Sequence, residues 1–271
     1  MAKTVLITGA SSGIGRATAA LFQAKGWNVV ASMRSPEKET ELKDLPRVRI
    51  ARLDVTDDVT INEAVSDAID TFGTIDLLVN NAGYGAYGSL EATSLDSIRQ
   101  QFETNVIGPL AVIKAVLPHL RRQKSGTIVN VSSMGGRFAM PLGSLYHGSK
   151  FAVEGFSEAL FYELSAIGVQ VKIVEPGMTQ TDFGGRSFKF SHDEQLTEYG
   201  PIVEKTLNAF AALGTTPGTA SDVAATIFRA ATDGSAQLRY PSGKDAVMML
   251  DARQNDGDDT FLKRVGALFA L

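Results

Sequence analysis

Apolar and polar positions alternate regularly along the first 180 residues of the chain. Short apolar runs rich in Val, Ile and Leu, typical of strands buried on both faces of a sheet, are separated by segments with helical periodicity. The pattern predicts strands at residues 4–8, 27–33, 48–55, 75–83, 126–133, 169–177 and 237–241. It predicts helices at residues 13–26, 57–73, 95–120, 148–166, 201–213 and 220–232.

This alternation predicts an α/β fold, a doubly wound parallel sheet of the Rossmann-like kind with helices on both faces. No segment before residue 180 has the composition of a linker, so we expect a single Rossmann-like domain over residues 1–271. Past residue 180 the pattern loosens. We expect a substrate-loop region at about 178–200 and a C-terminal extension at about 243–271, whose stretch "DARQNDGDD" should face solvent.

Composition narrows the class of protein further. The chain has 271 residues, 44% of them hydrophobic, a net charge of −4 and no cysteine. It therefore has no basic footprint for nucleic acid and no thiolate metal site, and its three histidines show no metal-ligand spacing. No apolar run is long enough to span a membrane, and the N-terminus lacks the form of a signal peptide, so we expect a cytoplasmic enzyme.

The first predicted strand leads directly into "TGASSGIG" at residues 8–15. Glycines permit a tight turn and close approach of a ligand, and the helix that follows offers free N–H groups to a phosphate. Three residues separate Gly9 from Gly13, so the spacing is not G-x-G-x-x-G. A strand–helix turn without a ligand is the alternative, and the position on the first strand of a parallel sheet favours phosphate binding.

The end of the second strand bears on the choice of cofactor. It reads "VVASMRS", with Met33 and Arg34 where an NAD site usually has a carboxylate, and no carboxylate before Glu37. A guanidinium binds a phosphate in a forked geometry, whereas a carboxylate would repel it. Arg34 therefore predicts NADP(H). Arg16 is either a second positive charge for the phosphate or a solvated surface residue.

Tyr146 and Lys150 lie four residues apart, on one face of a predicted helix. A cation beside a phenol stabilises phenolate, so Tyr146 would exchange a proton nearer neutral pH than a free phenol does. The spacing alone more often reflects a tyrosine ring packed on a lysine stem. Other motifs in the chain must decide between these two interpretations.

Over residues 4–182 the sequence resembles the short-chain dehydrogenase/reductase family. The matching motifs occur in order on the expected elements: "TGASSGIG" at 8–15, "LDV" at 53–55, "NNAG" at 80–83, "TNVIG" at 104–108, "VSS" at 131–133, "YHGSK" at 146–150 and "PGMTQT" at 176–181. The step of thirteen residues from Ser133 to Tyr146 is also that of the family.

The resemblance implies that Asn105, Ser133, Tyr146 and Lys150 are catalytic. Tyr146 would donate the proton, Ser133 would orient the substrate oxygen, and Asn105 would hold Lys150 through water. The strand period turns Ser132 to the opposite side from Ser133. His147 points about 100° away from Tyr146 on the helix, so we expect a structural or pocket-lining role for it.

The motifs also imply the residues of the cofactor site and of the substrate pocket. The expected cofactor contacts are Gly9, Ser11, Ser12, Gly13, Ile14, Gly15, Arg34, Asp54 (at the adenine amine), Val55, Asn81, Ala82, Gly83, Tyr146, Lys150, Pro176, Gly177, Thr179 and Thr181, with Thr181 favoured over Thr179 for the nicotinamide carboxamide. The expected apolar pocket consists of Met134, Phe138, Met140, Leu145, Met178 and Phe183. No metal site is expected.

The resemblance implies a reversible, NADPH-dependent reduction of a hydrophobic ketone or aldehyde, as in hydroxysteroid and retinol dehydrogenases. An NAD-dependent alcohol dehydrogenase and a non-catalytic dinucleotide sensor are the alternatives. The expected partner is a small hydrophobic carbonyl or alcohol, with neither nucleic acid nor membrane. A homodimer or homotetramer formed through the helices at 95–120 and 148–166 is implied by the family.

Overall fold

A computed structural model describes residues 2–181, 187–213 and 217–271. Its centre is a seven-stranded sheet in which every described pair of neighbours is parallel, in the order β11-β7-β6-β4-β1-β2-β3. The strands are β1 (Thr4–Ile7), β2 (Asn28–Met33), β3 (Val48–Arg52), β4 (Leu77–Asn80), β6 (Gly126–Val131), β7 (Val169–Pro176) and β11 (Arg239–Ser242). The predicted doubly wound sheet is confirmed, with its change of direction between β1 and β4.

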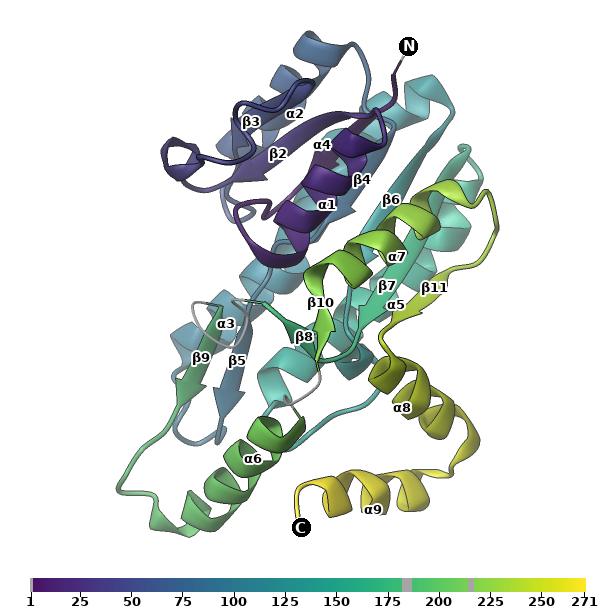
Figure 1. The fold of residues 1–271 in the computed structure, drawn as a ribbon. Helices are drawn as coiled ribbons and strands as arrows, with labels where there is room; N and C mark the ends of the chain where they lie inside the picture. The colour runs from purple at the N-terminus through teal and green to yellow at the C-terminus, as the bar shows by residue number, and fades with distance from the viewer. Residues whose placement is uncertain (1, 182–186, 214–216) are drawn as a thin grey trace.

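Helices cover both faces of this sheet, as the apolar strands require (Figure 1). One face carries α1 (Gly13–Ala24) and α7 (Ala220–Thr232). The other carries α2 (Asp58–Phe72), α4 (Gly108–Gln123) and α5 (Ser144–Ser165). Every residue of β1 and β4 is buried, because each of these central strands packs against helices on both sides.

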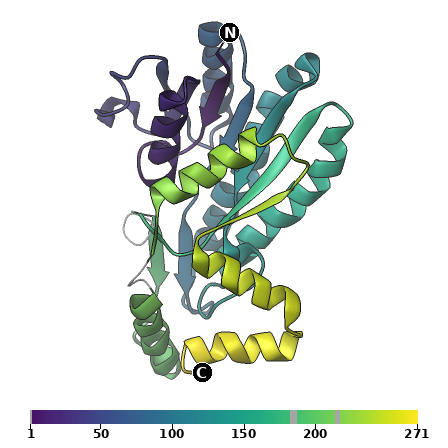
Figure 2. The same ribbon diagram turned by 45° about the vertical axis from the view of Figure 1, so that its right-hand side comes forward.

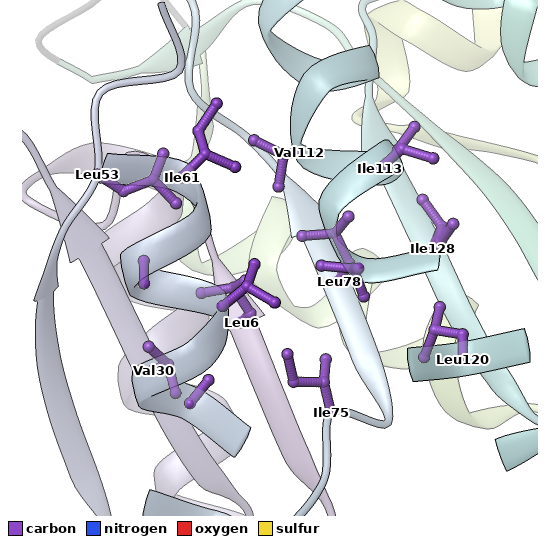
Figure 3. Packing of buried hydrophobic residues seen from close by; sticks show 14 of the residues in the cluster. Leu6, Val30, Leu53, Ile61, Ile75, Leu78, Val112, Ile113, Leu120 and Ile128 are labelled. Atoms are coloured by element: carbon purple, nitrogen blue, oxygen red, sulfur yellow. The ribbon is translucent and has the colours of Figure 1, made fainter. Parts of the chain in front are cut away.

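The core between the sheet and the second helix layer consists of interleaved aliphatic side chains. Leu6 and Leu78 from the sheet meet Ile61 of α2 and Val112 of α4, all of them almost fully buried (Figure 3). The ends of α2 follow from local chemistry, since Asp57 accepts hydrogen bonds from Val59 N and Thr60 N, and Gly73 ends the helix in the left-handed region. This packing fixes the strand ends that form the site.

The predicted helix over 95–120 is not continuous. It consists of α3 (Leu95–Phe102), a π-helical turn η2 (Glu103–Ile107), and α4. A π-turn places an extra residue in the helix and is common at functional sites. The position expected to be catalytic, Asn105, lies inside this turn.

Two short parallel sheets lie outside the main sheet. One pairs β5 (Gly85–Gly88) with β9 (Phe188–Ser191), in a region expected to be loop, and the other pairs β8 (Thr179–Gln180) with β10 (Gly218–Thr219). The β5–β9 pair requires glycine at position 88, where φ is +130° and a Cβ would lie 2.1 Å from Ser191 O.

The C-terminal extension forms two helices, α8 (Lys244–Asn255) and α9 (Asp258–Leu268), which meet α6 (Gly200–Leu213) below the sheet (Figure 2). Here the Phe210 and Phe269 rings are 5.6 Å apart. The three helices and the turn η3 (Met134–Gly136) enclose a separate apolar cluster. Within the described ranges of the chain, no helix has the length and apolar character needed to cross a membrane.

Candidate active site

A cavity of about 1100 Å³ opens where the parallel strands end. Ligands bind at this edge of doubly wound sheets, near the change of strand direction. Of the residues expected to bind the cofactor, those lining the cavity are Gly9, Ser11, Ser12, Gly13, Ile14, Arg34, Asp54, Val55, Asn81, Ala82, Gly83, Tyr146, Lys150, Pro176, Gly177, Thr179 and Thr181.

Gly15 is the one member of the expected cofactor set that does not line the cavity. A Cβ on Gly15 would lie 2.2 Å from the carbonyl oxygen of Gly9, so the bare Cα lets α1 pack directly on the turn after β1. Gly15 therefore shapes the site without facing it.

The N-terminus of α1 faces the cavity through Ser12, Gly13 and Ile14. No Ser12 side-chain bond caps the first turn, and no acidic residue lies in it. Gly9 and Gly13 have positive φ values of 70° and 52°, so both turns depend on glycine. The exposed N–H groups and the positive end of the helix dipole fit the pyrophosphate of a dinucleotide.

Asn81 joins the turn after β4 to the turn after β1. Its Nδ2 donates to Thr8 O at 3.0 Å and to Gly9 O at 3.2 Å. The backbone N–H groups of Asn81 and Ala82 both donate to Thr8 Oγ1. The floor of the expected cofactor site is thus held together by hydrogen bonds between two loops far apart in the sequence.

Cations and carboxylates meet at the expected adenosine end of the cavity, which Met33, Arg34 and Lys38 line. The Arg16 guanidinium is paired with Glu39 at 3.1 Å and with Glu41. Glu39 is buried and also accepts from the N–H groups of Glu41 and Leu42. Arg16 is thus an ion-paired residue, while Arg34 and Lys38 have no carboxylate partner among the described residues.

Tyr146, Lys150 and Ser133 meet on one wall of the cavity. Tyr146 and Lys150 are on successive turns of α5, and Lys150 Nζ lies 6.0 Å from the centre of the Tyr146 ring. Ser133 follows β6, and its hydroxyl forms a hydrogen bond with Tyr146. Ser132 faces away toward Glu154 of α5, as the strand period predicts.

The structure corrects the expected titration of Tyr146. Burial raises the pKa of Tyr146 to about 12, and the hydrogen bond from Ser133 opposes this only in part. Burial also lowers the pKa of Lys150 to about 8, against the attraction of Glu154. Desolvation favours the neutral form of each group and is the largest influence on both pKa values. Tyr146 is therefore a protonated phenol at neutral pH.

Asn105 lies behind the cavity wall. Its Nδ2 donates to Tyr84 O at 2.9 Å and to Ser149 Oγ at 3.1 Å, and its Oδ1 accepts from Tyr84 N. Lys150 Nζ instead donates to Val131 O at 2.9 Å. Asn105 thus joins η2 to the start of β5 and to α5, and it makes no direct contact with the lysine.

The expected substrate residues are divided between wall and core. Met134, Met140 and Met178 line the cavity. Phe138 is buried against Phe261, with ring centres 5.3 Å apart, and Leu145 is also buried, so neither lines the cavity. Phe183 lies outside the described residues.

Tyr87 of β5 and Phe210 of α6, which sequence reasoning did not place in the pocket, line its expected substrate end together with Phe188 of β9. The Tyr87 ring is 5.5 Å from Tyr146, 5.3 Å from Phe188 and 5.6 Å from Phe210. The sequence carried one signal for Tyr87, a β-like "AYG" after the "NNAG" turn. Its neighbours come from distant segments, so their meeting could not be read from spacing.

His147 holds the loop that carries the methionines. Its Nε2 accepts from Met140 N at 3.1 Å, so the proton is on Nδ1, which donates to Gly135 O at 2.8 Å. Burial lowers the pKa of His147 and keeps the ring neutral. The expected structural role of His147 agrees with this geometry.

Asp245, at the start of α8, was also missed. Its Oδ2 accepts from Met178 N at 2.6 Å, and its carboxylate fills the space where a Cβ of Gly177 would be. Asp245 therefore holds the turn after β7, at the expected nicotinamide end. Only the fold brings residue 245 to this turn.

Comparison with known proteins agrees with this arrangement. The family model described as short chain dehydrogenase matches residues 3–191. An oxidoreductase of Schizosaccharomyces pombe is 43% identical over 230 residues, covering 85% of this chain and 96% of the relative. Retinol dehydrogenase 8 of Homo sapiens is 38% identical over 193 residues, covering 68% of this chain and 61% of that relative.

Solved structures extend the likeness to the whole fold. A short-chain dehydrogenase of Streptomyces avermitilis has a TM-score of 0.81 and 34% identity, covering 98% of this chain and 96% of that one. ElxO with NADP bound has a TM-score of 0.76 and 28% identity, covering 92% and 100%. A short-chain dehydrogenase/reductase of Burkholderia phymatum in complex with NAD has a TM-score of 0.80 and 25% identity, covering 94% of each chain. The chain is an oxidoreductase of the short-chain dehydrogenase family.

Proposed function

We propose that this oxidoreductase is an NADPH-preferring reductase of bulky hydrophobic ketones or aldehydes, with Tyr146 as the proton donor. The observation that carries the proposal is the meeting of Ser133, Tyr146 and Lys150 on a wall that continues into an apolar, aromatic surface. A sensor of dinucleotides would need a cofactor cleft but none of these three residues.

The role of each residue follows from its position. A bound nicotinamide would supply the hydride to the carbonyl carbon. Tyr146 Oη then gives its proton to the carbonyl oxygen, which the Ser133 hydroxyl orients. The Lys150 ammonium, 6.0 Å from the ring, offsets the negative charge left on the phenol oxygen. Because the pKa of Tyr146 is raised to about 12, the phenol is protonated at physiological pH and can act as the acid when the carbonyl is reduced.

The preference for NADPH rests on Arg34 and Lys38. Both line the cavity beside Met33 and have no carboxylate partner among the described residues, so both are available to a 2′-phosphate. Arg16 contributes less because Glu39 and Glu41 already bind it. ElxO, a structural neighbour, has NADP bound.

A second candidate is an NAD-dependent alcohol dehydrogenase. Glu39 favours it, since this buried carboxylate lines the same end of the cavity, where a ribose hydroxyl would lie. The neighbour from Burkholderia phymatum is in complex with NAD. Against this candidate, both oxygens of Glu39 already accept hydrogen bonds, from Arg16, Glu41 and Leu42.

The substrate class follows from the lining of the cavity beyond Tyr146. Tyr87, Phe188 and Phe210 form one side, and Met134, Met140 and Met178 form another. Aromatic rings and flexible thioethers favour a large apolar molecule over a sugar or a small polar acid. The relative named retinol dehydrogenase 8 supports the same class.

A homo-oligomer remains part of the proposal. Large apolar side chains are exposed on the helices expected at the interface, namely Leu95, Phe102, Ile107, Phe151 and Tyr162. Covering them with a second copy would remove this apolar surface from water. Light scattering of the purified chain measures the oligomeric state, and a monomer at all protein concentrations would contradict the proposed homo-oligomer.

The test of the function is a panel of ketones and aldehydes of increasing size, each followed by nicotinamide absorbance with NADPH and with NADH. We expect turnover with hydrophobic carbonyls and a higher kcat/KM with NADPH. A preference for NADH would support the second candidate. Tight binding of cofactor with no turnover across the panel, and none in the reverse direction with the alcohols, would support the sensor.

A further inference from the structure

A group of charged side chains lies buried behind Lys150, and the proposed chemistry uses none of them. Glu154 of α5 and Glu175 of β7 are 5% and 1% exposed. Burying a carboxylate costs several kcal/mol unless cations and hydrogen bonds compensate for the lost water. The partners of these two carboxylates therefore determine what the group does.

Two arginines reach the carboxylates from the solvent side. Arg239 Nε of β11 is 2.9 Å from Glu154 Oε2 and 3.8 Å from Glu175 Oε1. Arg239 also binds Glu158 of α5, and Arg137 Nη1 is 3.3 Å from Glu175 Oε1. Three carboxyl groups thus face two guanidinium groups, and burial together with the charge of Glu154 raises the pKa of Glu175 to about 7.

Lys150 is the buried cation next to this group. It lies one turn before Glu154 on α5, and Tyr146 lies one turn before Lys150, with all three side chains buried on the helix. A Cβ on Gly136 would lie 3.0 Å from Glu154 Cγ and 3.0 Å from Lys150 O, so nothing separates η3 from this part of α5. Of the three glutamates, Glu154 is the one whose charge acts on Lys150.

One oxygen of Glu154 is not used by the arginines. Glu154 Oε1 is buried, and no described group makes a well-aligned hydrogen bond to it. Burial raises the pKa of Glu154, and the nearby Ser132 hydroxyl, Arg239 and Arg137 oppose that rise. A buried carboxylate oxygen that accepts no well-aligned hydrogen bond acts on its surroundings mainly through its charge.

We propose that Glu154 is a positioning residue for the reaction, whose negative charge keeps Lys150 in its ammonium form beside Tyr146. This rests on the proposed roles of Tyr146 and Lys150. The attraction of Glu154 opposes the effect of burial on the pKa of Lys150. The charged groups facing Glu154 are Arg137, Arg239, Glu158 and Glu175, together with Lys150 itself.

A purely structural role for Glu154 makes a different prediction. In that case the carboxylate only ties β11 to α5 through Arg239, and its loss lowers the melting temperature without changing the titration of Lys150. Glu158 provides a matched control, because it binds the same guanidinium but its side chain is 49% exposed. Glu158→Gln weakens the tie and leaves the charge at position 154 in place.

The test is a pH titration of Lys150 by NMR on the full chain with isotope-labelled lysine, the signal being assigned with Lys150→Met. We expect Glu154→Gln to lower the midpoint by about one unit, a tenfold change in the protonation equilibrium. Glu158→Gln should titrate like the unaltered protein. Glu154→Leu, an apolar residue of similar size, makes the same prediction if the glutamine variant does not fold.

Activity provides an independent second measurement. The alkaline limb of the pH profile for carbonyl reduction should move to lower pH in Glu154→Gln, because less of Lys150 is then charged at a given pH. A midpoint that stays in place in both Glu154 variants overturns the proposal, whatever their activity. A different result would contradict the proposed function itself, namely full turnover in Lys150→Met.

Discussion

The two ends of the cavity are built in different ways. The end expected to bind the cofactor consists of short turns placed directly after β1, β2 and β4, and hydrogen bonds tie these turns to one another, as Asn81 Nδ2 does with the carbonyls of Thr8 and Gly9. The substrate end consists of side chains from η3, β5, β9 and α6, supported from below by α8 and α9.

This difference separates a part of the site whose geometry depends on the main sheet from a part that depends on peripheral side chains. Turns on a buried parallel sheet keep their geometry, because a change there disturbs the strands themselves. Side chains on short peripheral elements can be exchanged at the cost of local contacts only. We therefore expect changes at one end of the cavity to leave binding at the other end nearly intact.

Tyr146→Phe removes the proposed proton donor, which lies where the two ends of the cavity meet. Loss of the proton donor should reduce turnover by about 10²- to 10⁴-fold, the usual size of a general-acid contribution. Cofactor binding, measured by fluorescence, should change little because the ring and its packing against Tyr87 remain. Turnover close to that of the unaltered protein would remove Tyr146 from its proposed role.

Arg34→Ala tests the cofactor end alone. Loss of a charge-assisted contact of ~1.5–3 kcal/mol should raise the KM for NADPH by roughly ten- to a hundred-fold. The KM for NADH and that for the carbonyl should change little. Arg16→Ala is the control, and its effect should be smaller because Glu39 and Glu41 already bind that guanidinium. Equal effects of the two changes would mean that the ion pair opens when cofactor binds.

The difference between the two ends of the cavity also explains how much of the site could be predicted from the sequence. All seven strands of the main sheet followed from local patterns, and the cofactor residues implied by the family resemblance, apart from Gly15, line the cavity. Phe138 was misplaced and Phe210 was missed because packing across α6 and α9 decides which ring faces the cavity. The π-turn at Asn105 has no periodic signal of its own.

The pKa values of the site residues also could not be predicted from the sequence. The spacing of Tyr146 and Lys150 gives their attraction but not their burial, and burial determines the direction of both pKa shifts. Glu154 shows the same limit. Its position one turn after Lys150 is visible in the sequence, whereas Arg239 and Glu175 reach it from strands that the fold brings together.

Asp245→Ala tests whether the two ends are truly separate, because this carboxylate joins α8 of the substrate side to the turn after β7. Removing the acceptor for Met178 N, a hydrogen bond to a charged group worth ~1.5–3 kcal/mol, should reduce kcat/KM about tenfold or more. Part of the effect should appear in cofactor binding. Asp245→Asn keeps an acceptor oxygen and should lose less. If neither variant alters cofactor binding, the C-terminal helices support the substrate side only.

Phe210→Ala should have the smallest effect and should be confined to the substrate end. The Phe210 ring lies against Tyr87 at 5.6 Å and against Phe269 at 5.6 Å, so it forms wall and support at once. An aromatic contact of ~0.5–1.5 kcal/mol corresponds to a two- to ten-fold rise in KM for a bulky carbonyl. The KM for a small aldehyde that does not reach the ring should stay unchanged, and so should the KM for NADPH.

Phe210→Leu retains apolar bulk and controls for loosening of α6. Its KM for the bulky carbonyl should lie between that of the unaltered protein and that of Phe210→Ala. A uniform loss across large and small substrates would show that Phe210 holds the fold and does not select the substrate.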